Sequence, residues 1–112
     1  MTTFDERERA FENKFVREQD LVFSARAIRN RRIANWAAEQ AGLPPQERFP
    51  YEAEIVRCGV ADGDDAVVQR LRSVLDAAGI AVSEHQLRRR MADWLDEDTR
   101  GLYSPTKQRN AL

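Results

Sequence analysis

No glycine or proline interrupts the first 41 residues, and this unbroken stretch most constrains what the chain can fold into. Glycine and proline are the residues that most often end a helix. We therefore expect one helix that starts near Phe4, where Thr3 and Glu6 have the spacing of a capping box, and that runs to Gln40. At a rise of 1.5 Å per residue, such a helix is about 55 Å long.

The two halves of this stretch carry different apolar patterns. In the second half the apolar positions fill a wide arc of the helix: Leu21, Val22, Ala25, Ile28, Ile33, Trp36 and Ala37. In the first half they form a single thin line that spans roughly 40° at about 100° per residue. The line consists of Phe4, Phe11, Phe15 and Val22. A thin line buries little area, so the first half adds little to the stability of the domain.

Two interpretations of this thin line stay open from the pattern alone. Spaced aromatic residues on one helix face are typical of a helix that docks into a groove of another protein. Alternatively, the phenylalanines cap the core of the chain's own bundle.

Three shorter helical segments follow, and no stretch alternates as a strand would, so the sequence predicts an all-α fold. The linkers are AGLPPQERFP, GVADGDD and AGIAVS. We expect Gly42, Gly59 and Gly79 to end the preceding helices in a left-handed conformation. Pro50 is expected to be the first residue of a short second helix.

Each shorter segment has an apolar face that we expect to be buried. In the second segment the face consists of Tyr51, Ile55 and Cys58; in the third, of Val67, Val68, Leu71, Val74, Leu75 and Ala78; in the fourth, of Leu87, Met91, Trp94 and Leu95. Ser83 and Gln86 form a capping box before the fourth segment, and Val82 with Leu87 has the spacing of a hydrophobic staple.

Composition and charge bound the class of protein. A chain of 112 residues with 42% hydrophobic and 33% charged residues is expected to form one small domain. The net charge of −1 gives no basic field that would attract nucleic acid or anionic lipid. We see no secretory signal or membrane-spanning run. The single cysteine, Cys58, agrees with a reducing compartment and reads as a small core residue. These features predict a cytoplasmic protein with no direct membrane insertion.

No pattern of catalytic or metal-binding residues is visible, so we expect a protein that is not an enzyme. His85 is the only histidine, and no cysteine or second histidine lies at metal-ligand spacing, so no metal site is predicted. No glycine-rich phosphate loop or nucleophile elbow is present.

Two arginine clusters support an alternative function, a small nucleotide- or nucleic-acid-binding helical module. The clusters are Arg26, Arg29, Arg31 and Arg32, and Arg88, Arg89 and Arg90. Helical spacing spreads each cluster around its helix, so neither makes one concentrated patch. Arg29 and Arg32 fall inside the apolar arc, where we expect them to extend along the edge of the bundle. Because acidic residues nearly match basic ones, nucleic acid is a disfavoured partner.

Three stretches together resemble a known family. MTTFDERERAFENKF, NWAAEQAGL and AGIAVSEHQLRRRM are similar to the ζ-subunit family of alphaproteobacterial rotary ATP synthases, the inhibitor proteins of that enzyme. The resemblance runs from Met1 to about Leu95. It implies a four-helix bundle (residues 20–98) with a mobile, helix-prone N-terminal segment (residues 1–19). An irregular tail (residues 99–112) lies outside the resemblance, and we assign it no role.

The resemblance also implies a mechanism. The N-terminal segment would fold as a helix in the cleft between an α and a β subunit of the catalytic head, approach the central γ stalk and block ATP hydrolysis. Its apolar anchors would be Phe4, Phe11 and Phe15, and its polar contacts would be Asp5, Glu6, Arg7, Glu8, Glu12, Lys14 and Arg17. The protein would work at the cytoplasmic face of the inner membrane, held there by the ATP synthase. No cofactor is implied beyond weak nucleotide binding on the bundle, whose site is unknown.

Overall fold

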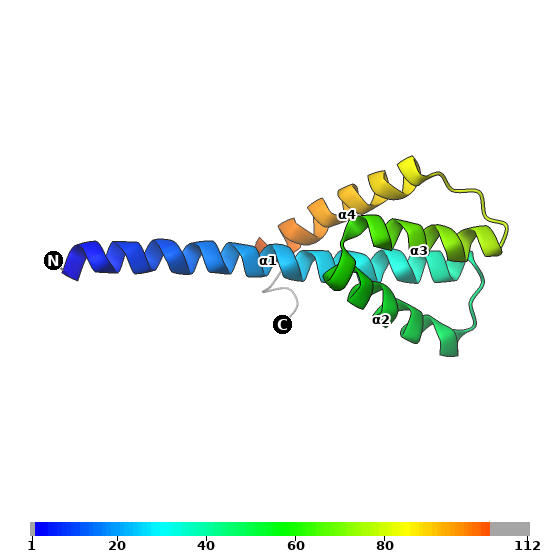
Figure 1. The fold of residues 1–112 in the computed structure, drawn as a ribbon, viewed down its shortest axis with the longest axis horizontal. Coiled ribbons are helices and arrows are strands. Elements are labelled where there is room, and N and C mark those ends of the chain that lie inside the picture. Colours follow the sequence, from blue (N-terminus) through cyan, green and yellow to red (C-terminus); the bar gives the residue numbers. More distant parts are fainter. Residues whose placement is uncertain (1, 104–112) are drawn as a thin grey trace.

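The structure is a computed structural model that describes the backbone of residues 2–103 and the side chains of residues 18–102. Within this range the fold is all-α, as predicted, with helices α1 (Thr2–Gln40), α2 (Pro45–Asp62), α3 (Asp64–Ala77) and α4 (Glu84–Tyr103). Helices α2, α3 and α4 pack around the C-terminal half of α1. The N-terminal half of α1 projects from this bundle as a single helix (Figure 1).

Helix α1 is continuous, as the missing breakers predict, and it ends in a Schellman motif at Gly42. The φ of Gly42 is +72°, a conformation that favours glycine. Its N–H donates to the carbonyl of Glu39 at 3.1 Å, and the N–H of Leu43 donates to that of Ala38 at 2.9 Å. At the other end, α1 begins at Thr2 rather than near Phe4. The side chains of the predicted Thr3–Glu6 capping box lie outside the described residues.

Gly79 ends a helix as predicted, whereas the prediction that Gly59 also ends one is wrong. Gly79, with φ +75°, ends α3 in a second Schellman motif, in which the N–H of Ile80 reaches the carbonyl of Leu75 at 2.9 Å. Gly59 instead lies inside α2, which ends at Gly63 with φ +85°. A Cβ at Gly59 would lie 2.3 Å from Nδ2 of Asn30. Glycine is needed there because α1 and α2 approach closely.

Helix α2 starts earlier than predicted, at Pro45 rather than at Pro50. Pro45 is the first helical residue, where its missing N–H costs nothing, and Pro44 before it is extended with ψ 151°. Pro50 lies inside the helix, five residues from its start. There the ring deprives only the carbonyl of Gln46 of its usual partner, and Gln46 is exposed to water.

The core of the bundle takes side chains from all four helices and confirms most of the predicted faces. Its buried members are Ile33, Ala34, Ala37, Ile55, Cys58, Val67, Val68, Leu71, Leu75, Leu87 and Met91. Three predicted positions are exposed instead. Ala78 is the residue at which α3 ends. Val22 precedes Ala25, the first fully buried residue described in α1, and Ile28 lies on a side of α1 that the bundle leaves open.

Helix α4 begins with the predicted capping box, but it ends later than the sequence predicts. The N–H of Gln86 donates to Oγ of Ser83 at 3.1 Å, and the N–H of Ser83 donates to Oε1 of Gln86 at 2.9 Å. Of the predicted staple, Leu87 belongs to the buried core cluster, and Val82 is partly buried and packs against that cluster. The helix continues to Tyr103, so residues 99–103 are helical rather than irregular. The remainder of the predicted tail lies outside the described residues.

The distribution of buried residues predicts that the projecting half of α1 and the bundle contribute unequally to stability. Deleting residues 1–17 should leave thermal unfolding nearly unchanged, because among the side chains that the structure describes the buried apolar residues lie between 25 and 91. Leu71→Ala should lower the free energy of unfolding by about 2–5 kcal/mol, because Leu71 is fully buried between the helices. Circular dichroism melts of the two variants and the full chain test both expectations. Unfolding of the truncated protein would show that the N-terminus is part of the core.

The capping box at the start of α4 gives a second stability prediction. Ser83→Ala should destabilise the fold by about 0.5–2 kcal/mol, because the N–H of Gln86 loses its acceptor. Ser24→Ala is the matched control, since Ser24 is exposed inside α1, where alanine is the better helix former. Chemical denaturation should separate the two variants, and an equal response would contradict the cap.

Candidate functional site

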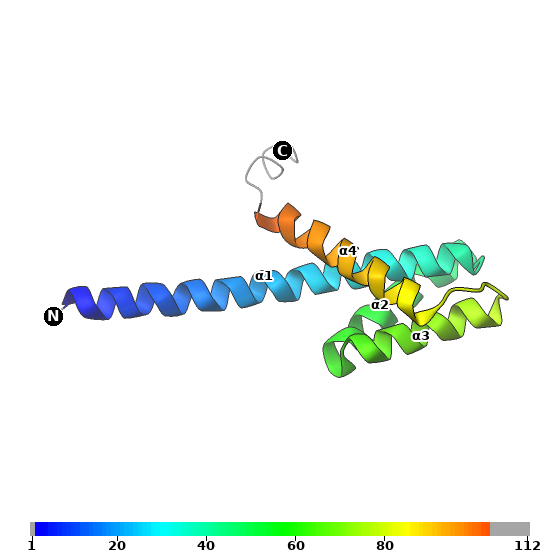
Figure 2. The same ribbon diagram turned by 90° about the horizontal axis from the view of Figure 1, so that it is seen from above.

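The predicted inhibitory segment, residues 1–19, coincides with the half of α1 that projects from the bundle (Figures 1 and 2). Residues 18–20, where the segment meets the bundle, are exposed, and Leu21 is half-buried. All ten predicted contact positions lie on this helix: Phe4, Asp5, Glu6, Arg7, Glu8, Phe11, Glu12, Lys14, Phe15 and Arg17. Their side chains lie outside the described residues, so the structure places their backbone only.

The predicted line of apolar residues lies on the same face of α1 as residues that are buried in the bundle. At about 100° per residue, positions 4, 11, 15 and 22 share a face of α1 with positions 29 and 33, within roughly 40°. Arg29 and Ile33 are buried in the bundle. The face that α1 turns toward its own core therefore continues along the projecting half, where no other described helix lies beside it (Figure 1).

Arg29 fixes α1 within the bundle and corrects the prediction that it extends along the bundle edge. Its side chain is only 1% exposed. The guanidinium donates to Oδ1 of Asp64 at 2.6 Å, to the carbonyl of Met91 at 3.3 Å and to Oδ1 of Asn30 at 2.9 Å. Asp64 is the first residue of α3, and Met91 lies on α4. One side chain of α1 thus binds two other helices of the bundle.

The charge on Arg29 survives this burial because its partners are polar. Burial lowers the pKa of Arg29, while the neighbouring carboxylate of Asp64 raises it in part. A guanidinium stays protonated in proteins, so the contact is an ion pair at neutral pH. Sequence reasoning placed Arg29 in an apolar arc. An arginine at such a position is itself the signal that a carboxylate must lie opposite.

A second group of contacts joins α1 to α4 through alternating arginine and tryptophan side chains. The guanidinium of Arg90 lies 4.3 Å from the ring centroid of Trp36 and 5.2 Å from that of Trp94. The guanidinium of Arg32 lies 4.5 Å from the ring centroid of Trp94 and donates to Oδ1 of Asp98 at 2.6 Å. Such cation–π contacts stabilise each pair by about 0.5–2 kcal/mol. They hold α4 along α1.

These contacts disperse the two arginine clusters, in agreement with the expectation from the sequence. Arg29 and Arg32 are bound to carboxylates, and Arg88 is paired with Asp65 at 2.8 Å and Glu84 at 3.1 Å. Hydrogen bonds to these two carboxylates raise the pKa of Arg88. The other exposed arginines of the two clusters, Arg26, Arg31 and Arg89, lie on different parts of the surface.

Two open hollows flank the tryptophan pair. Trp36 and Trp94 line both of them, with Arg89 and Arg90 on one side and Arg31 and Arg32 on the other. Aromatic and guanidinium groups together are what a nucleotide would need for stacking and phosphate contact. Weak nucleotide binding stays a prediction, and these hollows are its candidate site.

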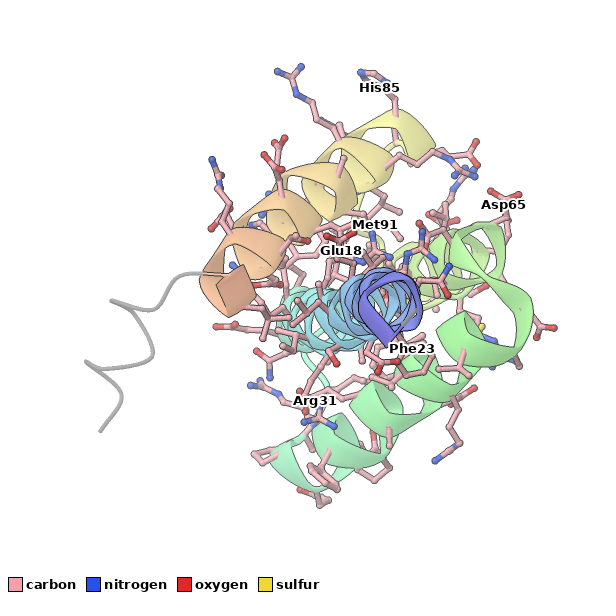
Figure 3. All side chains as sticks on the ribbon, turned by 90° about the vertical axis from the view of Figure 1, so that its left-hand side faces the viewer. Glu18, Phe23, Arg31, Asp65, His85 and Met91 are labelled. Carbon is pink, nitrogen blue, oxygen red and sulfur yellow. The ribbon has the colours of Figure 1, made fainter. Side chains whose placement is uncertain are left out.

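The remaining polar groups offer little for catalysis. His85 points away from the bundle on the outer side of α4 (Figure 3). Among the described residues no cluster of histidine, cysteine and carboxylate side chains fits a metal ion. The Tyr51 hydroxyl is buried without a hydrogen-bond partner, and burial raises its pKa, so it stays neutral. Within the same part of the chain, no helix is long and apolar enough to cross a membrane.

Sequence reasoning missed two exposed apolar residues that lie close to the predicted segment. Phe23 is 56% exposed on α1, and Val60 is 59% exposed near the end of α2. Phe23 falls about 100° around the helix from the line through Val22, so it belongs to no predicted face. The position of Phe23 outside every predicted face was the sequence signal for its exposure, because a large aromatic residue outside the core-facing arc must face solvent or a partner.

Comparison with known proteins identified one family. The model of a family described as ATPase inhibitor subunit zeta matches residues 1–100. The matched region includes the projecting half of α1, the whole of α2 and α3, and α4 except for its last three residues. No curated protein and no solved structure matched the chain.

The ion pair at Arg29 predicts unequal effects for two neighbouring carboxylates. Asp64→Ala should destabilise the fold by about 3 kcal/mol, because it leaves the buried guanidinium without its counter-charge. Asp65→Ala should cost only about 0–1 kcal/mol, because Asp65 pairs with Arg88 on the surface. Both residues lie in the first turn of α3, so helix-dipole effects cancel in the comparison. Equal losses in denaturant titrations would contradict the anchoring role of Arg29.

Proposed function

The chain belongs to the ATPase inhibitor subunit zeta family, and from this premise we propose how it inhibits ATP hydrolysis by the ATP synthase. The projecting half of α1, residues 1–19, inserts at the interface between an α and a β subunit of the catalytic head. There it approaches the γ stalk and blocks the rotation that hydrolysis drives. The bundle of residues 20–98 stays outside the cleft and holds the inserted helix at one end.

The observation that best supports this proposal is the continuation of one helix face. The face of α1 that carries Arg29 and Ile33 in the core extends through position 22 to positions 15, 11 and 4. In the bundle this face is covered by α3 and α4, and in the projecting half no described helix covers it (Figure 2). Phenylalanines on an uncovered helix face are suited to a hydrophobic cleft of another protein.

The proposed roles follow from the chemistry of each side chain. Phe4, Phe11 and Phe15 are spaced over about 16 Å of helix, and their burial in the cleft would supply most of the affinity. The charged residues between them would pair at the rim of the cleft, where water weakens each contact. These rim residues are Asp5, Glu6, Arg7, Glu8, Glu12, Lys14 and Arg17. The proposed action is mechanical and needs no catalytic group on this chain.

The same proposal sets the partners and the location. The α, β and γ subunits of the ATP synthase are the partners, and the protein works on the cytoplasmic face of the inner membrane through them. The competing idea of a phosphate-binding module is less well supported, because three of the seven clustered arginines are bound to carboxylates within the fold. Those side chains would have to give up an existing ion pair to contact a phosphate.

The mechanism predicts that the phenylalanines matter far more than their charged neighbours. Phe11→Ala or Phe15→Ala should weaken inhibition at least about thirtyfold, because a buried aromatic anchor is worth about 2 kcal/mol or more. Glu8→Ala should have a smaller effect, and Phe49→Ala, which removes an exposed phenylalanine on α2, should have none. ATP hydrolysis by the cognate enzyme, titrated with each variant, gives the comparison.

Two controls complete this experiment. Circular dichroism should be the same for all variants, because none of the changed side chains belongs to the described core. The protein without residues 1–17 should not inhibit. If that truncated protein and both phenylalanine variants inhibit as well as the full chain, the insertion mechanism is wrong.

A further inference from the structure

A groove runs along α1 from the base of the projecting helix to the corner between α2 and α3. Its first part is lined by Glu18, Gln19, Val22, Phe23 and Arg26. Its second part shares Phe23 and Arg26 with the first and ends at the corner around Gly63. The two parts lie side by side, with Phe23 and Arg26 between them. Figure 3 shows Phe23 on the side of α1 that faces α2.

The floor of this groove exposes apolar surface that the fold does not use. Val22, Phe23 and Val60 line it, and they are three of the five large apolar residues that the described part of the chain leaves exposed. Single exposed apolar residues are normal on a protein surface. Three that line one groove indicate a contact site instead.

The rim of the groove is acidic. Among the described residues it carries four carboxylates and one guanidinium: Glu18, Asp62, Asp64, Asp65 and Arg26. Asp64 and Asp65 are already paired, with Arg29 and Arg88 respectively. Asp62 is exposed at the end of α2. An apolar floor with an acidic rim complements a segment that carries an apolar side chain next to lysine or arginine.

Two occupants suit such a surface: a second copy of this chain, or the protein that receives the inhibitory segment. The size and the position of the groove favour the second. A stable dimer buries roughly 20–30 residues on each side, far more than this groove offers. The groove begins at Glu18, where the proposed inhibitory segment ends, and it follows the same helix. A protein that receives the projecting half of α1 must therefore lie next to the groove.

We propose that this groove is a second docking site for the head of the ATP synthase. It binds a basic segment with an apolar side chain at the mouth of the cleft that takes the inhibitory helix. The inference rests on the proposed function, since it assumes that this helix enters the ATP synthase. The groove adds affinity and fixes the orientation of the bundle, whereas the inserted helix blocks rotation.

The test compares full-length variants with changes inside and outside the groove. Phe23→Ser with Val60→Ser removes the apolar floor without touching the core, since both side chains are more than half exposed. Phe49→Ser is the matched control, because Phe49 is 73% exposed and lies outside the groove. Asp62→Lys reverses a rim charge, and Asp76→Lys reverses an exposed charge elsewhere. Binding to the immobilised cognate ATP synthase and inhibition of its ATP hydrolysis are both measured.

We expect the Phe23→Ser/Val60→Ser variant to bind the ATP synthase about tenfold more weakly than the natural protein. It should also inhibit about tenfold more weakly, and at saturation it should reach the same inhibition. Asp62→Lys should weaken binding severalfold, and the two control variants should not differ from the natural protein. If the double variant binds as tightly as its Phe49→Ser control, the groove is not a docking site. The groove proposal is also overturned if the natural protein does not bind, or if the groove variants change only its self-association in sedimentation.

Failure of this inference and failure of the proposed function give different results. If Phe11→Ala abolishes inhibition while the groove variants behave as the natural protein, the groove proposal alone is overturned. If the groove variants bind weakly while Phe11→Ala inhibits normally, the insertion mechanism fails and the groove remains a contact site. Circular dichroism of each variant confirms that the bundle is folded.

Discussion

The buried guanidinium of Arg29 is the contact on which the arrangement of the helices depends. It reaches the first residue of α3 through Asp64 and the backbone of α4 through the carbonyl of Met91, while its own helix supplies Asn30. Burying a guanidinium is a costly way to gain stability, because its charge must leave water, although its partner Asp64 stays half exposed. It is effective for specifying geometry, since the guanidinium has donors at fixed angles. A shift of α3 along α1 would separate Arg29 from its counter-charge on Asp64, and a shift of α4 would break the hydrogen bond to the carbonyl of Met91.

Only part of α1 belongs to the bundle. Ala25 is the first fully buried residue described in α1, and it lies one turn before Arg29. Further toward the N-terminus Leu21 is half-buried and residues 18–20 are exposed, and the projecting half has no described helix beside it (Figure 1). The fold therefore divides one helix into a half that is packed in the bundle and a half that projects from it. The projecting half is the part that the proposed function assigns to the ATP synthase.

Much of the fold was predictable because local signals agree with the final structure. The absence of breakers before Gly42, the cap formed by Ser83 and Gln86, and the apolar face around Leu71 all depend on neighbours within a few residues. The errors arose where contacts between helices override local preference. Gly59 reads as a helix end, yet it lies inside α2 at a point where a side chain would meet Asn30 of α1.

Only part of the candidate site was predictable from the sequence. Spacing along α1 reveals the line of phenylalanines, and the resemblance assigns them to an inhibitory segment. The groove beside Phe23 was not predictable, because Val60 and Asp62 reach it only through the packing of α2 on α1. A surface made by two helices leaves no periodic signal in either one. The groove therefore becomes visible only in three dimensions, although the position of Phe23 outside the predicted faces was a signal in the sequence.

The continuity of α1 has a thermodynamic consequence for inhibition. Starting a helix is unfavourable by a factor of roughly 10⁻³, because several residues must be fixed before the first hydrogen bond forms. In this chain the bundle already holds residues 21–40 as a helix, so the projecting half can extend from an existing end. Binding in a cleft then requires less ordering than it would for a separate peptide. The bundle thereby contributes to the affinity of the segment that the proposed function assigns to the partner.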